Sequence, residues 1–176
     1  MSDYVIRRAG YDQATIEGLT DVLIDVVEGG ASVGFMLPLA RERAHAHWEA
    51  ALRSADRNER ILLVAEDSKS GVIMGTVQVV FAAPENQPHR ADIAKMQVHR
   101  RARRHGLGAA LMRAAEAAAL DAGKTVLVLD TVTGSDAERL YTRLGWQRVG
   151  EVPDFALWPR GGMCSTTFFY RHLARD

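Results

Sequence analysis

One segment constrains the fold more than any other, because residues 91–130 combine a strand, a glycine-bearing turn, a helix and a second strand. ADIAKMQV (91–98) has strand chemistry, and an alanine-rich helix is predicted from about Leu107 to Ala122, closed by Gly123. TVLVLD (125–130) is almost wholly apolar, as in a strand buried within a parallel pair. This succession predicts two parallel strands joined by a helical crossover.

The flanking segments predict a mixed sheet rather than an all-parallel one. ILLVAE (61–66) and VIMGTVQVV (72–80), joined by the turn-rich DSKSG, predict an antiparallel hairpin. The other expected elements are a strand at 3–8, a helix capped by Asp12 and stopped by Gly29 and Gly30, a helix from Pro38 to about Ser54, a helix in SDAERLYTRLG, and strands in WQRVGEV and CSTTFFYRHL. The order βααβββαβαββ predicts an α/β (α+β) fold with a central mixed, mostly antiparallel sheet flanked by helices.

Composition narrows the class of protein. The length of 176 residues predicts a single domain that spans residues 1–176. Lysine plus arginine and aspartate plus glutamate balance at 22 each, so we expect neither a nucleic-acid nor a membrane partner. The single cysteine, Cys164, excludes an internal disulfide and a four-cysteine zinc site. The lack of a signal-like start or an apolar run of membrane-spanning length favours a soluble, cytoplasmic protein. His45 and His47 lie two apart on a predicted helix and face different sides, so no metal site is expected.

The strongest chemical signal is the stretch VHRRARRHGLGAALM (98–112), in which a strand runs through Gly106 and Gly108 into a helix. The first amides of a helix have no internal acceptor, and the helix dipole adds partial positive charge there. Glycines let a ligand approach the backbone, so the turn can cradle a pyrophosphate. The neighbouring arginines add positive charge: Arg100, Arg101, Arg103 and Arg104.

Several interpretations compete for this turn. It can be an ordinary glycine turn with a solvated arginine run. A Rossmann dinucleotide site would use Asp130 at the end of the next strand, but Leu111 stands where the third glycine belongs. A Walker A loop ending in AGKT (122–125) is excluded by Ala118 at its first glycine position. A nucleic-acid patch is a further interpretation, although the basic run is isolated and no aromatic residues are interleaved with it.

Two motifs together resemble the GNAT family of N-acetyltransferases. The family's R/Q-x-x-G-x-G/A pattern appears as Arg103 to Gly108, and its A-x-x-x-Y-x-x-x-G-[FW] pattern appears at Ala137, Tyr141, Gly145 and Trp146. Arg104 and Arg100 replace a frequent glycine and a common proline. GGASVGFM, RADIAKMQV, LDTVTGSDAERLY and RVGEVP extend the likeness to nearly the whole chain, towards members that inactivate a β-lactam toxin. The resemblance implies the GNAT fold, with one parallel splay in the sheet.

The resemblance also implies acetyl-CoA as co-substrate, without a metal. Backbone amides of the glycine turn would hold the pyrophosphate, and the strand at Met96 and Val98 would pair with the pantetheine arm. The Met96 amide would stabilise the oxyanion of the reacting thioester. The implied cofactor contacts are Met96, Gln97, Val98, Arg103, Arg104, His105, Gly106, Leu107, Gly108, Ala109, Thr131, Ser135 and Tyr141. Ser135 also fits an S-x-x-E capping box with Glu138, which is its more ordinary role.

Three residues are candidates for proton transfer. By family analogy Tyr141 donates a proton to the departing thiolate, although its ring could instead simply pack its helix onto the sheet. Strand alternation would put Asp92 on the same face as Ala94, Met96 and Val98, which makes it one candidate general base. Asp130 ends the parallel strand and is the other candidate. Either carboxylate could instead bond a loop. Cys164 has no catalytic signature around it and is expected to be a small strand residue.

Two segments are candidates for binding the acceptor amine. The loop GGASVGFM offers an apolar wall in Phe35 and Met36 and polar contacts in Glu28 and Ser32, or else it merely connects two helices. Residues 150–162 form a second candidate wall, or cover the site of a partner in a homodimer. The leading hypothesis is acetylation of a small-molecule amine, such as an antibiotic or amino-acid-like toxin, with a role in antibiotic resistance. Acetylation of protein N-termini or lysines, and a non-catalytic acyl-CoA sensor, are the alternatives.

Overall fold

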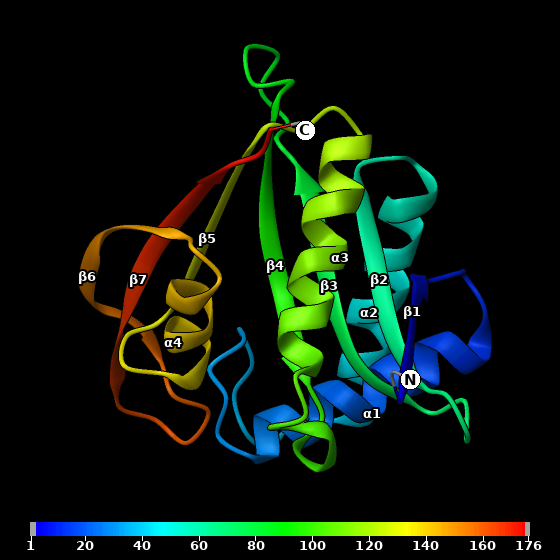
Figure 1. Ribbon diagram of the computed structural model, residues 1–176. Helices are drawn as coiled ribbons and strands as arrows, with labels where there is room; N and C mark the ends of the chain where they lie inside the picture. Colours follow the sequence, from blue (N-terminus) through cyan, green and yellow to red (C-terminus); the bar gives the residue numbers. More distant parts are fainter. Residues whose placement is uncertain (1–2, 175–176) are drawn as a thin grey trace.

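The computed structural model describes residues 3–174, in which all the strands belong to one sheet with helices on both faces (Figure 1). Along the chain the elements are β1 (Tyr4–Arg8), α1 (Gln13–Glu28), α2 (Arg41–Asp56), β2 (Arg60–Asp67), β3 (Ile73–Phe81), β4 (Arg90–Val98), the short 3-10 helix η1 (Arg100–Ala102), α3 (Leu107–Asp121), β5 (Val126–Val132), α4 (Asp136–Arg143), β6 (Gln147–Leu157) and β7 (Met163–His172). Apart from η1, this is the element order that the sequence predicts.

The sheet has the strand order β1-β2-β3-β4-β5-β7-β6, and only β4 and β5 run parallel. That parallel contact is short, because only three residue pairs join the strands: Arg90–Val126, Ala91–Leu127 and Asp92–Val128. Beyond them β4 and β5 separate, as the divergence of the two strands in Figure 1 shows. The expectation that 125–130 is buried in a parallel pair is thus only partly right, since antiparallel pairing with β7 occupies all of β5.

Two apolar clusters hold the helices to the sheet. Helices α3 and α4 pack on one face, where Leu111, Met112 and Phe169 are fully buried. Helices α1 and α2 pack on the other face, around Leu23 and Trp48. A helix of this kind is stabilised chiefly by burying one apolar face, at roughly 25 cal/mol per Å² of apolar surface removed from water. The two layers fix the faces of the sheet on which any site must lie.

A β-bulge interrupts β4 where it has left β5. Gln78 of β3 pairs with Ala94 of β4, and Thr76 of β3 pairs with Gln97 of β4. Between these two pairs β3 has one residue and β4 has two, so β4 carries one extra residue. Lys95 lies in the bulge with a left-handed φ of 50°. The strand alternation predicted from the sequence is therefore wrong beyond Ala94. Met96 and Val98 pack with Ala91 and Ile93 on the α3 face, opposite to Asp92.

The helix boundaries follow local capping chemistry. Asp12 accepts a hydrogen bond from the Thr15 amide at 2.9 Å and begins α1, and Gly29 ends it, as predicted. The second helix begins at Arg41, not at Pro38. The chain before it is held instead by a long-range contact, because the Leu37 amide donates to the Pro159 carbonyl at 2.9 Å.

Within residues 3–174, the helices are all too short or too polar to cross a lipid bilayer.

Helix α2 carries a histidine that faces inwards. The His47 ring lies edge-on to Phe35 at 5.2 Å and to Trp48 at 5.0 Å between ring centroids. Its Nε2 atom is buried without a hydrogen-bond partner among the described residues. Burial, with smaller contributions from the charges of Lys95 and Arg60, lowers the pKa of His47 to about 4. His45 instead faces Glu17 and Glu49 on the surface, so the two histidines do point to different sides.

We predict that His47 makes the protein less stable as the pH falls from 7.5 to 5.0. The unfolded chain binds the proton near pH 6.5 and the folded chain only near 4, so stability is lost across that interval. His47→Gln should reduce the loss by about 1 kcal/mol, after allowance for solvent screening of a half-buried ring. Urea unfolding at the two pH values measures this. An NMR titration of His47 in the folded protein with a midpoint above pH 6 would contradict it.

Candidate active site

The amino end of α3 is an open donor site beside the gap between β4 and β5. The first amide bonded within the helix is that of Ala110, which donates to the Gly106 carbonyl at 3.1 Å. No side chain caps this end, whereas Asp12 caps α1 and Ser135 caps α4. The preceding amides therefore have neither an intrahelical acceptor nor a cap, and the helix dipole favours an anion there.

The two glycines of the turn serve different purposes. Gly106 adopts a left-handed φ of 78°, and a Cβ placed on it would meet nothing within 4 Å, so it opens onto free space. A Cβ on Gly108 would approach Leu140 Cδ2 to 3.1 Å. Gly108 therefore allows α3 to pack closely against α4, with the Met96 side chain also nearby. The turn thus brings β4, α3 and α4 together at one place.

The four arginines of the turn are not equivalent. Arg100 donates to the Asp25 carboxylate through its backbone amide and Nε at 2.8 and 2.9 Å, which braces the turn against α1. Arg103 donates from Nε to the Val98 carbonyl at 3.2 Å. The exposed side chains of Arg101 and Arg104 have no hydrogen-bond or ion-pair partner among the described residues, so they remain available to an anion. The charges of Arg104 and Arg103 also contribute to lowering the pKa of Asp136 at the start of α4, after its bond with Arg139.

Tyr141 lies on the buried side of α4. Its ring centroid is 6.2 Å from those of both Trp146 and Phe169, so the residue does pack its helix onto the sheet. Burial, and next the nearby Asp130 carboxylate, raise the pKa of the Tyr141 phenol, which stays protonated at physiological pH. No protein group among residues 3–174 is hydrogen-bonded to the hydroxyl. The phenol is therefore a retained proton donor without an assigned acceptor.

The two candidate carboxylates have different surroundings. Asp130 Oδ2 accepts a hydrogen bond from the Thr166 hydroxyl at 2.7 Å and lies within electrostatic reach of Tyr141 and Lys95. Asp92 Oδ1 accepts from Arg90 at 2.7 Å, at the point where β4 and β5 part. Of the two, Asp130 is the one that the structure brings towards Tyr141.

The remaining expected cofactor contacts divide between exposed backbone and buried side chains. His105 and Gly106 are exposed, whereas the Leu107 side chain is buried in the core and can offer only its amide. The buried Gln97 side chain has no hydrogen-bond partner among residues 3–174. Ser135 accepts from the Glu138 amide at 3.1 Å, which confirms its capping role, and its Oγ lies 3.4 Å from that of Thr131. Ala109 is partly buried in the first turn of α3.

The loop between α1 and α2 is tied to the β6–β7 hairpin. The Ser32 hydroxyl donates to the Leu157 carbonyl at 3.0 Å, and Arg160 donates to the Glu28 carbonyl at 3.0 Å. Phe35 packs against the α1–α2 cluster with Arg43 over its ring. Met36 is 39% exposed. Of the four expected acceptor residues, Ser32, Phe35 and Met36 lie on this loop, and Glu28 is the last residue of α1 just before it. The Ser32 hydroxyl already donates to the hairpin.

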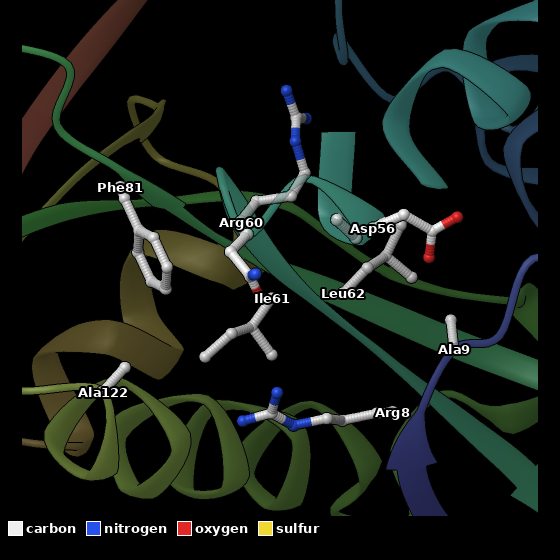
Figure 2. A pocket seen from close by; sticks show the side chains of 10 residues that line it. Arg8, Ala9, Asp56, Arg60, Ile61, Leu62, Phe81 and Ala122 are labelled. Carbon is white, nitrogen blue, oxygen red and sulfur yellow. The ribbon is translucent and has the colours of Figure 1, made fainter. Parts of the chain in front are cut away.

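A cavity of about 240 Å³ lies elsewhere, at the end of α3 remote from Gly106 (Figure 2). Its lining includes Arg8, Arg60, Phe81 and Ala122, where the ends of β1, β3 and α3 meet the start of β2. None of the residues expected from the sequence to be functional lines it, so geometry near the glycine turn, not this cavity, marks the candidate site.

Sequence reasoning missed Lys95. A lysine between alanine and methionine in a strand matches no motif. Its side chain points towards the α1–α2 loop only because Lys95 lies in the β-bulge. Its ammonium nitrogen lies 3.4 Å from the place that a Cβ on Gly34 would occupy, in the loop between α1 and α2. The candidate site therefore includes a cation that no local pattern indicates.

Comparisons with known proteins agree on the family. The sequence profile described as "Acetyltransferase (GNAT) family" matches residues 32–146. An uncharacterized N-acetyltransferase of the hisH-hisA intergenic region of Azospirillum brasilense is 32% identical over 167 residues, which cover 92% of this chain and 96% of that protein.

Solved structures share the fold at low identity. A phosphinothricin acetyltransferase from Sinorhizobium meliloti in complex with AcCoA is 18% identical, with a TM-score of 0.82 and coverage of 98% of this chain and 90% of that one. A ribosomal-protein-alanine N-acetyltransferase from Brucella melitensis is 22% identical, with a TM-score of 0.77 and coverage of 96% and 99%. These two proteins are named for different acceptors, so the shared fold does not determine the acceptor. With the parted strands, the uncapped helix and both sequence motifs in place, the chain belongs to the GNAT family of acetyltransferases.

Proposed function

We propose that this protein transfers an acetyl group from acetyl-CoA to the primary amine of a small molecule, by direct attack within a ternary complex. The observation that carries the proposal is the open amino end of α3 beside the parted strands β4 and β5. The amides of residues 104–109, with Arg101 and Arg104, would hold the pyrophosphate, and the edge of β4 at Met96 and Val98 would receive the pantetheine arm. A pyrophosphate suits this turn because Gly106 leaves open space beside it and the first amides of α3 have no hydrogen-bond acceptor.

In the reaction, the amine nitrogen bonds to the thioester carbonyl carbon, the C–S bond breaks, and the thiolate takes up a proton. Asp130 is the preferred base for the proton that the ammonium acceptor must lose, and Asp92 is the second candidate, directly or through water. Tyr141 donates to the departing sulfur, since its phenol stays protonated and has no protein acceptor among residues 3–174. The Met96 amide, fixed in the sheet, stabilises the oxyanion. Holding both reactants in the gap contributes by proximity.

The tied loop favours a small acceptor over a protein. Hydrogen bonds from Ser32 to Leu157 and from Leu37 to Pro159 join the α1–α2 loop to the β6–β7 hairpin. A peptide chain needs an open groove, whereas these bonds hold the loop that carries Phe35 and Met36 against the hairpin. Acetylation of protein N-termini or lysines stays the alternative, and a non-catalytic acyl-CoA sensor the third.

An amino-acid-like toxin or antibiotic is the acceptor class that the likenesses support. The stretches GGASVGFM and RADIAKMQV resemble the tabtoxin resistance protein, and the Sinorhizobium meliloti relative is named for phosphinothricin. The proposal extends to a single catalytic domain over residues 1–176 and to a cytoplasmic protein, in keeping with a free, buried Cys164.

Calorimetry with acetyl-CoA tests the binding step. Gly106→Ala should weaken binding by about 10-fold or more, because the new Cβ enters the space that the pyrophosphate would occupy. Gly123→Ala is a matched control, since Gly123 ends the same helix with φ 77° and equally open surroundings. Both substitutions incur similar backbone strain, but the control should keep wild-type affinity. Absence of heat with the wild-type protein would remove the proposed function.

Turnover tests the proton donor. Tyr141→Phe should lower kcat by about 100-fold with an amine acceptor, while the KM for acetyl-CoA and the melting temperature stay near wild type. The phenylalanine ring keeps the contacts with Trp146 and Phe169, and the hydroxyl bonds no protein group among residues 3–174. Asp130→Asn should also lower kcat, because an amide cannot take up the proton that the acceptor loses. Tyr11→Phe, on a distant surface, serves as control. If CoA release by both variants equals that of the wild type, these roles are wrong.

A homodimer through the late strands is also proposed. Edge strand β6 and the hairpin expose apolar side chains: Val149 at 66%, Val152 at 42%, Phe155 at 50%, Leu157 at 45% and Met163 at 61%. Exposed apolar groups along an unpaired sheet edge favour association. Sedimentation velocity at micromolar concentration should show a dimer, and Val149→Lys should shift it towards monomer. A wild-type protein that sediments only as a monomer would refute the dimer.

A further inference from the structure

The residue that the proposed mechanism leaves unused is Lys95, at the bulge of β4. Its φ of 50° lies in the left-handed backbone region, which residues with a side chain seldom adopt. Such an outlier persists only where its surroundings hold it, and it often accompanies a functional constraint. The bulge turns Lys95 away from the α3 face, where Met96 and Val98 pack.

The ammonium of Lys95 lies against the acceptor loop without a protein partner. Its nitrogen is 3.4 Å from the position of a Cβ on Gly34. In the part of the chain that the structure describes, it donates no hydrogen bond and forms no ion pair. The side chain is partly buried, and burial lowers the pKa of its ammonium. An unpaired cation that is partly shielded from water is unfavourable, and a ligand that supplies the missing negative charge would offset that cost.

Two titratable residues, Asp130 and His47, lie near Lys95 on different elements. Asp130, on β5 across the gap, is close enough to oppose the effect of burial on the pKa of Lys95 but is not in contact. His47, on α2, is close enough for Lys95 to contribute to lowering its pKa. Lys95 therefore stands between the proposed base and the acceptor loop.

Several polar atoms on this side of the sheet lack a hydrogen-bond partner. Among residues 3–174 the buried ones are the donors Trp48 Nε1, Gln78 Nε2 and Gln97 Nε2, the acceptor Gln97 Oε1, and His47 Nε2, which donates or accepts according to its tautomer. Gln78 pairs across the sheet with Ala94, the neighbour of Lys95, and its Oε1 is already occupied by Arg60 at 2.7 Å. The negative charge of Asp92 is matched by Arg90. The unpaired ammonium of Lys95, with unpartnered amide and indole donors on the same side of the sheet, favours an anionic ligand.

We propose that Lys95 binds a carboxylate of the acceptor and so orients the acceptor amine towards Asp130 and Tyr141. The protein would then select amines that also carry a carboxylate, and Lys95 is a specificity-determining residue rather than a proton carrier. This inference rests on the proposed function, because it assigns the acceptor of that same site.

A panel of amino acids and their carboxamides, read by CoA release, tests the inference. The wild-type protein should prefer acids to amides. Lys95→Met keeps an unbranched chain but removes the charge, and it should raise the KM for acids by about 10- to 100-fold. The KM for amides should change less than about twofold, because no charge pair is lost with them. A merely structural role for Lys95 would affect both classes alike.

Lys124→Met is the matched control. Lys124 lies over the Phe81 ring and donates to the Pro88 carbonyl, far along the chain from the acceptor loop, so the acid-to-amide ratio should not change. Calorimetry with acetyl-CoA should give wild-type affinity for Lys95→Met, which shows that the variant is folded.

Two results overturn the inference while leaving the acetyltransferase in place. One is a wild-type protein that binds acetyl-CoA but acetylates amides or other neutral amines as well as, or in place of, the acids. The other is an equal loss for acids and amides in Lys95→Met. A wild-type protein that gives no heat with acetyl-CoA and releases no CoA with any amine overturns the proposed function and this inference together.

Discussion

The early parting of β4 and β5 is the constraint on which the rest of the site depends. Three residue pairs join the strands, and after Asp92 neither strand supplies the other's backbone hydrogen bonds. Buried backbone groups need partners, so a strand edge within a sheet is a place where a ligand can complete the ladder. β5 pairs with β7 along its whole length, so β5 has a hydrogen-bonded neighbour throughout. β4 has no such neighbour on this side after Asp92, and its edge stays open.

The bulge at Lys95 assigns the two faces of that open edge to different tasks. Before it, Asp92 and Ala94 share the α1–α2 face, and after it Met96 and Val98 pack beneath α3. One inserted residue thus brings the helix start with Gly106 to one side of the gap and the lysine to the other. The proposed acetyl donor and acceptor would therefore approach the gap from opposite sides.

The hairpin of β6 and β7 has two consequences. Its tip bonds the loop between α1 and α2 through Leu157, Pro159 and Arg160, which fixes one wall of the acceptor side. Its edge strand exposes an apolar row that begins at Val149. The same segment thus connects the proposed acceptor site with the proposed dimer surface. Dimer formation there would therefore constrain the α1–α2 loop, which is proposed to contact the acceptor.

Local patterns in the sequence determined the element order, the caps at Asp12 and Ser135, and the glycine turn at Gly106, because each depends on residues within a few positions of one another. Both family motifs are of this local kind. The position of α2, the face of Met96, the nearness of Asp130 to Tyr141 and the exposure of Lys95 to the acceptor loop were decided only by the tertiary structure. They depend on register shifts and long-range hydrogen bonds, and a β-bulge inverts every later side chain of its strand without leaving a mark in the sequence.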